Sequence, residues 1–199
     1  YINYNLQKIT SIQPRPQGIT MFNLEKFIED CKKAVLSDTP QQQVKALMEN
    51  ALSDPNALQQ ALNEASSENS LAPLYCDENL TVLRVATPAN FVTPVHNHLM
   101  WAMIGILEGE EKNYIYRRTN NGGVEVEQEA VLTPETGVFT LRADAIHAIE
   151  TAPEKPLSGL HVYGGNILER SSRSMWHPET MEEVPYDFNQ LMDFCKVLI

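Results

Sequence analysis

The sequence predicts a mainly β protein, a small sandwich or barrel, preceded by a helical segment. Three observations support this fold class. Short apolar runs separated by turn residues recur between residues 80 and 163. Apolar residues recur at helical spacing between residues 23 and 65. The chain has 199 residues, 43% of them hydrophobic, which is enough for one substantial core.

Four segments are expected along the chain. They are an irregular extension at residues 1–20, a helical segment packed on the barrel at 21–70, the barrel at 71–170, and an irregular segment with a closing helix at 171–199. The first helix has Asn23 as its N-cap, and the third has Asp54 as N-cap and Pro55 at its first position. Helices are expected at residues 23–36, 41–52, 55–65 and 186–197.

The expected strands are short and are separated by turn residues. Asn120 to Gly123 and Pro134 to Gly137 are the clearest turn signals. Strands are expected at residues 80–86, 95–107, 112–118, 124–132, 138–141, 146–151 and 157–163. Regular spacing of this kind is typical of an all-β sandwich or barrel.

Composition excludes several classes of partner. The net charge of -11 argues against binding to nucleic acid or to an anionic membrane, which requires Lys and Arg to neutralise phosphates. No apolar run approaches the length of a membrane helix. The three cysteines (Cys31, Cys76 and Cys195) are far apart and suggest reduced thiols. We therefore expect a cytoplasmic protein with a small-molecule substrate; the sequence allows a homodimer without requiring one.

Four of the five histidines lie within predicted strands, which favours a metal site. His96 and His98 are two residues apart, so on one strand they point to the same face. His147 follows in a later strand as a third ligand. Imidazole is a common ligand for iron, nickel, copper and zinc. His161, in a further strand, is either a fourth ligand or a neighbour of the site.

These residues resemble the cupin superfamily, and within it the cysteine dioxygenase-like thiol dioxygenases and related metal-dependent double-stranded β-helix enzymes. The segment from Pro94 through His96 and His98 to Gly109 is similar to the first cupin motif, and Asp144 to His147 is similar to the second. The resemblance covers about residues 80–163, and it implies a cupin double-stranded β-helix, a jelly-roll barrel.

The resemblance also implies a site with three histidine ligands and a catalytic pair. Ala102 and Met103 stand where cupins usually carry a glutamate ligand, so the set is His96, His98 and His147. His161 and Tyr163 are similar to the His-x-Tyr pair beside the iron of thiol dioxygenases. Two departures stand out. No cysteine is present to crosslink the tyrosine, and Gly159 replaces the serine that precedes the histidine in those enzymes.

Chemistry assigns a role to each residue. Tyr163 would donate a hydrogen bond to dioxygen or substrate, and His161 would orient its hydroxyl. A substrate carboxylate would need a guanidinium partner, and Arg84 and Arg117 are the candidates.

The expected protein is an oxidoreductase, a non-haem Fe(II) dioxygenase that converts a small thiol such as cysteine or 3-mercaptopropionate to its sulfinate. The metal could also be Ni, Mn or Zn. Two alternatives remain open: another metal-dependent cupin enzyme (an isomerase, a hydrolase or a carbon-bond dioxygenase), or a cupin that binds a small ligand without chemistry.

Overall fold

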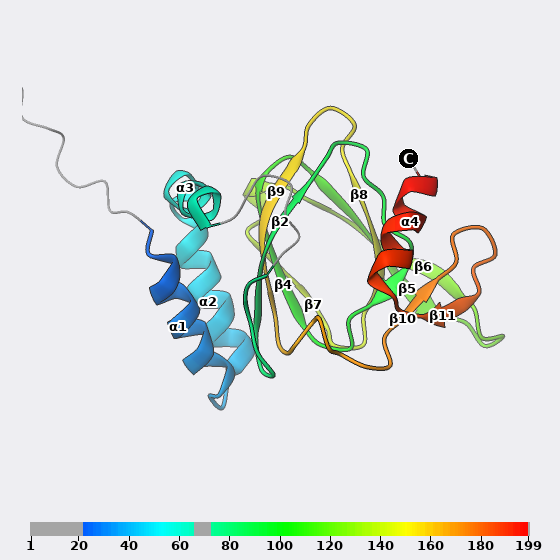
Figure 1. Cartoon of the computed structure of the whole chain (residues 1–199), viewed down its shortest axis with the longest axis horizontal. Coiled ribbons are helices and arrows are strands. Elements are labelled where there is room, and N and C mark those ends of the chain that lie inside the picture. The colour runs from blue at the N-terminus through cyan, green and yellow to red at the C-terminus, as the bar shows by residue number, and fades with distance from the viewer. Residues whose placement is uncertain (1–21, 66–72, 199) are drawn as a thin grey trace, which may run out of the picture.

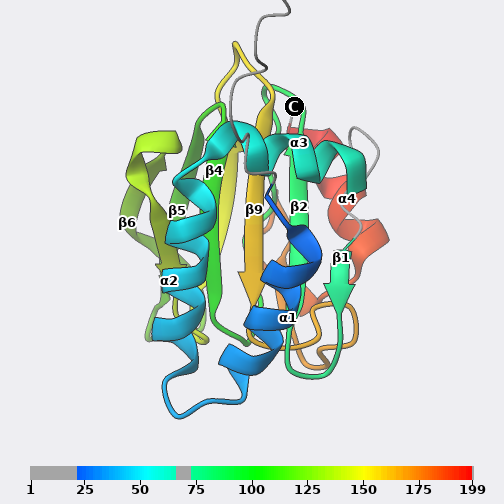
Figure 2. The same ribbon diagram turned by 90° about the vertical axis from the view of Figure 1, so that its left-hand side faces the viewer.

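Three helices form a layer on one side of the molecule. The computed structural model describes residues 22–65 and 73–198, so the extension expected at residues 1–20 lies outside the described part. The helices are α1 (Leu24–Val35), α2 (Pro40–Leu52) and α3 (Pro55–Ala65). They lie against the outer face of one sheet (Figures 1 and 2). The three helices expected in the N-terminal third are confirmed, nearly to the residue.

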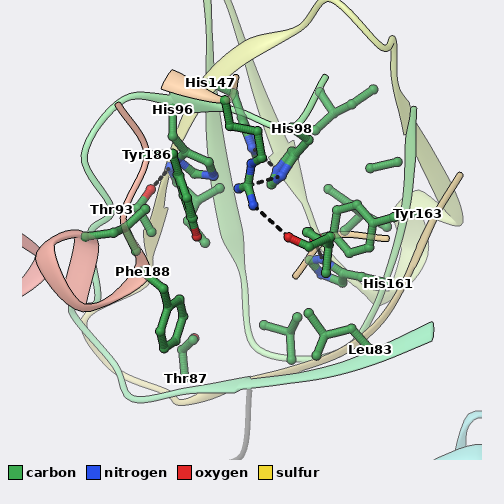
Figure 3. Close-up of a pocket in the computed structure, with 18 of the residues that line it drawn as sticks. Leu83, Thr87, Thr93, His96, His98, His147, His161, Tyr163, Tyr186 and Phe188 are labelled. Atoms are coloured by element: carbon green, nitrogen blue, oxygen red, sulfur yellow. Dashed lines mark hydrogen bonds between the residues drawn. The ribbon is translucent and has the colours of Figure 1, made fainter. Parts of the chain in front are cut away.

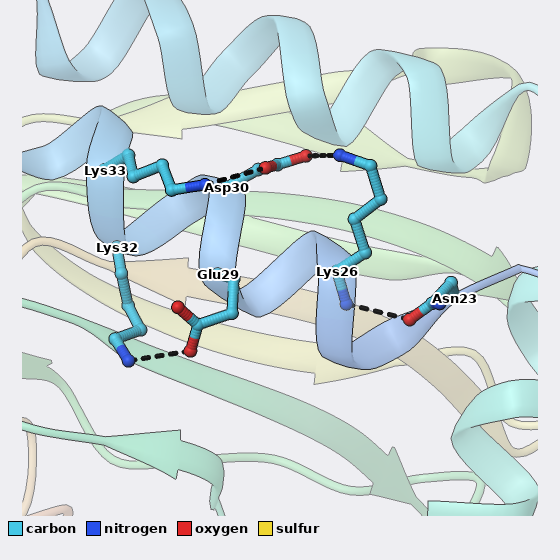
Figure 4. Close-up of polar contacts among 6 residues, drawn as sticks. All are labelled: Asn23, Lys26, Glu29, Asp30, Lys32 and Lys33. Atoms are coloured by element: carbon cyan, nitrogen blue, oxygen red, sulfur yellow. Dashed lines mark hydrogen bonds and ion pairs between the residues drawn. The ribbon is translucent and has the colours of Figure 1, made fainter.

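The side chains of α1 define its start and its exposed face. Asn23 Oδ1 accepts a hydrogen bond from the backbone N–H of Lys26 at 2.8 Å, which caps the helix as expected. Ion pairs join Lys26 to Asp30 and Lys32 to Glu29 along the exposed face (Figure 4). Surface pairs of this kind contribute little, so burial of the opposite face is what fixes the helix on the sheet.

The strands form two antiparallel sheets that face each other. Within the described residues, one sheet has the order β1-β2-β9-β4-β7 and the other has the order β11-β10-β3-β8-β5-β6. Most neighbours in each sheet are distant in the chain, because the strands alternate between the sheets. The strands are β1 (Pro73–Cys76), β2 (Thr81–Thr87), β3 (His96–Asn97), β4 (Ala102–Glu108), β5 (Glu111–Arg118), β6 (Val124–Leu132), β7 (Val138–Leu141), β8 (Ile146–Thr151), β9 (Leu157–Tyr163), β10 (Ser174–Trp176) and β11 (Glu183–Pro185), with a 3-10 turn at η1 (Pro134–Thr136). The fold is therefore mainly β, a cupin-type jelly roll, as the sequence predicts.

The central strands of the first sheet are covered on both faces. On the outer face, Val82 of β2 and Leu160 of β9 pack in one cluster with Met48 of α2. On the inner face, Leu83 of β2 and Ile104 of β4 belong to a second cluster, inside the barrel. Every residue of β9 is buried. Burial on both faces explains why these strands are apolar at successive positions instead of alternating.

The strand expected at residues 95–107 is wrong in one respect: it is two strands in different sheets. β3 ends at Asn97 and β4 begins at Ala102. Between them, Leu99 adopts a positive φ of 53°, which turns the chain from one sheet to the other. His98 therefore lies just beyond the end of β3 and not within a continuous strand.

The C-terminal segment is more ordered than expected. The irregular segment predicted after residue 171 contains β10 and β11, which extend the second sheet past β3. Helix α4 (Phe188–Leu198) follows and lies beside these strands, far from α1 to α3 (Figure 1). In residues 22–65 and 73–198 no helix has the length and apolar character needed to cross a bilayer.

Candidate metal centre

Three buried histidines converge inside the barrel. His96 of β3 lies directly opposite His147 of β8 in the antiparallel register, and His98 follows β3. Each ring offers one nitrogen, and the three nitrogens lie within 4.8 Å of one another. Figure 3 shows the three rings meeting in the cavity. His96 and His98 face the same cavity, as their spacing predicts, although His98 lies one residue beyond the end of β3.

His96 and His147 each use one ring nitrogen in a hydrogen bond and keep the other available to a metal. His96 Nδ1 lies 3.0 Å from the backbone oxygen of Pro94, and His147 Nδ1 lies 3.0 Å from Asn113 Oδ1. Both partners accept hydrogen bonds, so each Nδ1 carries the proton and each Nε2 is available as a ligand atom. His98 Nε2 lies 2.9 Å from His147 Nε2. That separation is short enough for both nitrogens to be held by one metal ion, since metal–imidazole distances are roughly 2.0–2.1 Å.

Burial keeps these imidazoles neutral. It lowers the pKa of His96 to about 4 and places the pKa values of His98 and His147 well below the usual range. A metal requires the neutral form of the ring, so the cluster is ready to bind a divalent ion at neutral pH. The residues present therefore fit a three-histidine metal centre.

Arg173 lies beside the cluster and was not foreseen. Its Nε donates to the backbone oxygen of Asn97 at 2.9 Å, its Nη1 donates to the oxygen of Ile167 at 3.0 Å, and its Nη2 lies 3.3 Å from His98 Nδ1. Its guanidinium also stacks on Tyr186, 3.5 Å from the ring centre. A neutral imidazole carries one proton, so His98 binds a metal through Nε2 only when its Nδ1 is protonated and the Arg173 N–H points elsewhere.

The predicted catalytic pair also lies in the barrel. His161 Nδ1 is 3.2 Å from the hydroxyl of Tyr163, and the Tyr163 ring centre is 5.1 Å from that of His98. Burial raises the pKa of Tyr163, so the hydroxyl stays protonated and can donate. Ala102 lies directly opposite Tyr163 in the β4–β9 register, where no sulfur is available for a crosslink.

Gly159, which stands where the thiol dioxygenases carry a serine, has no room for a side chain. A Cβ built at this position would lie 2.9 Å from the backbone oxygen of Gly105 on the neighbouring strand, which is too close for any side chain without a backbone shift. Ser158 does not replace it, because its hydroxyl donates to Gln59 of α3 at 2.9 Å, outside the barrel.

The histidines and Tyr163 line one cavity of about 200 Å³ between the sheets. Most of its wall is apolar, from Leu83 and Ile104 of the first sheet to Phe188 and Leu191 of α4. Figure 3 shows Phe188 and Leu83 at the cavity. Helix α4 thus forms part of the wall, and a mostly apolar enclosure with few polar groups is typical of a small-molecule site.

Glu111 contributes the one carboxyl among the described residues that line this cavity. Its Oε1 accepts a hydrogen bond from Asn113 Nδ2 at 2.7 Å, and Asn113 Oδ1 faces His147. The amide therefore links the carboxylate to His147 and fixes the proton of that ring on Nδ1.

The structure places the two arginines predicted to anchor the substrate outside this cavity. Arg84 is buried on the outer face of β2, where its Nη2 donates to Asn63 Oδ1 of α3 at 2.7 Å. Arg117 is exposed and paired with Glu125. The side chains of β2 that face the cavity are those of Leu83, Val85 and Thr87; because both faces of β2 are buried, the sequence does not show which side Arg84 takes.

Sequence reasoning also missed Glu111, Asn113 and Arg173. A weak signal existed for the first two, since Glu111 and Asn113 are two residues apart and share one face of a strand. Lys112 between them is also polar, so the sequence does not show which of the two faces is buried. Nothing local marks Arg173, which reaches the site through the return of the C-terminal segment.

Comparison with known proteins adds weak likenesses. No protein-family model and no curated protein sequence matches this chain. Among solved structures, the DMSP lyase DddQ from Ruegeria pomeroyi is 24% identical over 52% of this chain and 46% of its own, with a TM-score of 0.40. The cupin domain of Cnp3 from Schizosaccharomyces pombe is 17% identical over 49% and 61%, with a TM-score of 0.39. A double-stranded beta-helix protein from Klebsiella pneumoniae is 11% identical over 62% and 87%, with a TM-score of 0.40.

The chain spans less than half the length of the lyase it matches. At these identities and TM-scores the likenesses assign no activity. The strand order of the two sheets defines the fold, and the residues that line the cavity limit which reactions it can support. The chain has a cupin-type jelly-roll fold with a three-histidine cluster suited to a divalent metal in its interior.

Proposed function

We propose that this protein is a non-haem Fe(II)-dependent dioxygenase that oxidises a small thiol, of the cysteine or 3-mercaptopropionate type, to its sulfinate. The observation that carries the proposal is the grouping of His96, His98 and His147 with the His161–Tyr163 pair in one cavity. A set of three neutral ligands leaves coordination positions for substrate and dioxygen.

A bound Fe(II) would activate dioxygen and hold the thiol sulfur, while the surrounding side chains place the substrate. Tyr163 supplies a protonated hydroxyl beside His98. When His161 carries its proton on Nδ1, it donates to the Tyr163 oxygen and leaves the Tyr163 hydrogen directed at the cavity. The low-dielectric wall strengthens this hydrogen bond to any oxygen that develops negative charge.

Arg173 favours an anionic substrate. It is 5% exposed, it is the one Lys or Arg among the described residues that line the cavity, and no described carboxylate lies within ion-pair distance of it. A buried guanidinium without an acidic partner is a strong site for a carboxylate. Metal binding through His98 Nε2 would also release the Arg173 N–H that faces His98 Nδ1.

A second candidate is metal-dependent proton transfer without dioxygen, as in an isomerase or lyase. The observation that favours it is the Glu111 carboxyl in the cavity wall, because such reactions need a base beside the metal. Consumption of dioxygen separates the two candidates, since only the first requires it.

The experiment is metal analysis of the purified protein followed by oxygen-electrode assays with Fe(II) and a panel of thiols. We expect one metal per chain and thiol-dependent oxygen uptake, with sulfinate detected by mass spectrometry. His98→Ala should abolish both, whereas His177→Ala, which removes a histidine outside the cavity, should preserve both. Full metal occupancy without oxygen uptake for any thiol would refute the dioxygenase proposal and favour the second candidate.

A further inference from the structure

The side chain of Glu111 has one oxygen held and one oxygen without a partner. Asn113 Nδ2 donates to Oε1 at 2.7 Å, while Oε2 is buried and has no hydrogen-bond partner among the described residues. Glu111 is 0% exposed and lines the metal cavity. A buried polar oxygen without a partner is costly, so its retention in the cavity wall points to a ligand that uses it.

Within residues 22–65 and 73–198, no Lys, Arg or His forms an ion pair with this carboxyl. Its partners on the adjacent strands are Leu132 of β6 and Thr151 of β8, neither of which ionises near neutral pH. The negative charge of Glu111 helps to raise the pKa of Tyr163. The anchored Oε1 and the free Oε2 together define which atom would receive a proton.

The other groups of the cavity are poor proton acceptors. Burial lowers the pKa of His161 to about 3, and Tyr163 is protonated. His96, His98 and His147 would have their available nitrogens on the metal. Burial raises the pKa of Glu111 to about 7, which places it near the pH at which a base works best.

We propose that Glu111 is the proton acceptor of this cavity, and that its Oε2 takes the proton from the acidic group of the bound substrate. This rests on the proposed function, because the acidic group there is the thiol. The sulfur–hydrogen bond breaks and its electron pair stays on sulfur as the thiolate. The proton forms an O–H bond on Oε2, and the carboxylate becomes a neutral carboxylic acid. Nothing is oxidised in this step, and total charge is conserved.

The test counts the protons that leave the protein when a weak acid binds. Anaerobic Fe(II)-loaded protein is titrated by calorimetry at about pH 8, where Glu111 is ionised, in two buffers of different ionisation enthalpy. Two probes are used: 3-mercaptopropionate, and cyanide, which is supplied mostly as its conjugate acid and binds metals as the anion. The variants are Glu111→Gln, which keeps an acceptor for Asn113, and the control Glu110→Gln at the exposed neighbouring position. Circular dichroism and metal content verify that each variant is folded and loaded.

We expect Glu111→Gln to release about one more proton per bound ligand than the wild-type protein, because the proton then goes to buffer. Glu110→Gln should match the wild type. Equal release by Glu111→Gln and the wild type would overturn the assignment of Glu111 while leaving the dioxygenase intact. A difference with cyanide, but no binding of the thiol, would support Glu111 and refute the thiol substrate. Binding of neither probe would refute the open metal site on which both proposals stand.

Discussion

Replacing Glu111 by Gln should stabilise the metal-free protein at neutral and alkaline pH. The wild-type carboxylate is fully buried, and only one of its oxygens has a hydrogen-bond partner. Gln has nearly the same shape and keeps an oxygen to accept from Asn113, but it carries no charge. The substitution therefore removes the cost of burying a charge without creating a cavity.

The size of the effect follows from the pKa of the carboxyl. Burial raises the pKa of Glu111 from its ordinary value of 4.5 to about 7, opposed in part by the Asn113 hydrogen bond. A difference of about 2.5 in pKa corresponds to ~3 kcal/mol. Between these two pKa values the folded protein binds more protons than the unfolded chain, so the free energy of unfolding falls as pH rises. The penalty is absent below pH 4.5 and complete above the folded pKa.

Urea unfolding followed by circular dichroism, with chelator present, measures this effect across that pH range. The gap in unfolding free energy between Glu111→Gln and the wild type should widen by ~3 kcal/mol from pH 4.5 to about pH 8. The buried histidines titrate alike in both proteins and cancel in the difference. Glu110→Gln should show a constant gap. A constant gap for Glu111→Gln as well would mean that its pKa is ordinary in the fold, and the reasoning about its burial would be refuted.

Three further substitutions test the metal site and its neighbours. His98→Ala should weaken metal binding by more than the roughly 10- to 100-fold that losing a hydrogen-bond partner of a ligand costs, as measured by competition with a chelator; unchanged affinity would remove His98 from the ligand set. Tyr163→Phe should retain metal and an unmodified intact mass while turnover falls by roughly a hundredfold to ten-thousandfold; wild-type turnover would reduce Tyr163 to packing. Arg173→Gln should raise the apparent dissociation constant of carboxylate-bearing thiols by about tenfold or more and leave that of uncharged thiols unchanged. Arg117→Gln is the control for charge at the surface, and equal effects of the two arginine variants would contradict the anchor role of Arg173.

The sequence by itself determined the layers of the fold. Helical spacing of apolar residues predicted α1 to α3, because a surface helix needs one apolar stripe and shows it in the sequence. Seven short apolar runs separated by turn residues predicted most of the strands, because a buried strand is apolar along its length and ends at a turn. The motif around His96 and His98, with His147 downstream, predicted the three histidines that converge in the cavity, since a metal restricts both the residue types and their number.

The three short strands on one side of the second sheet were harder to predict from the sequence. β3 has two residues, and β10 and β11 have three each. A segment this short shows no periodicity, so its pairing depends on partners elsewhere in the chain. The break between β3 and β4 could not be found either, because Leu99, Met100 and Trp101 in the break are as apolar as the residues of β4.

Only the tertiary structure decided which other side chains share the cavity with the three histidines. Arg84 and Leu83 are adjacent in β2, yet Arg84 packs on α3 while Leu83 faces the cavity. Arg173 reaches the site because β10 pairs with β3, which places it beside His98. The residues that pack over a polar side chain decide whether it lies in the cavity or outside it, and those residues come from distant parts of the chain. Local pattern therefore predicted the histidine cluster, whereas long-range packing placed the Arg173 guanidinium and the Glu111 carboxyl in the same cavity.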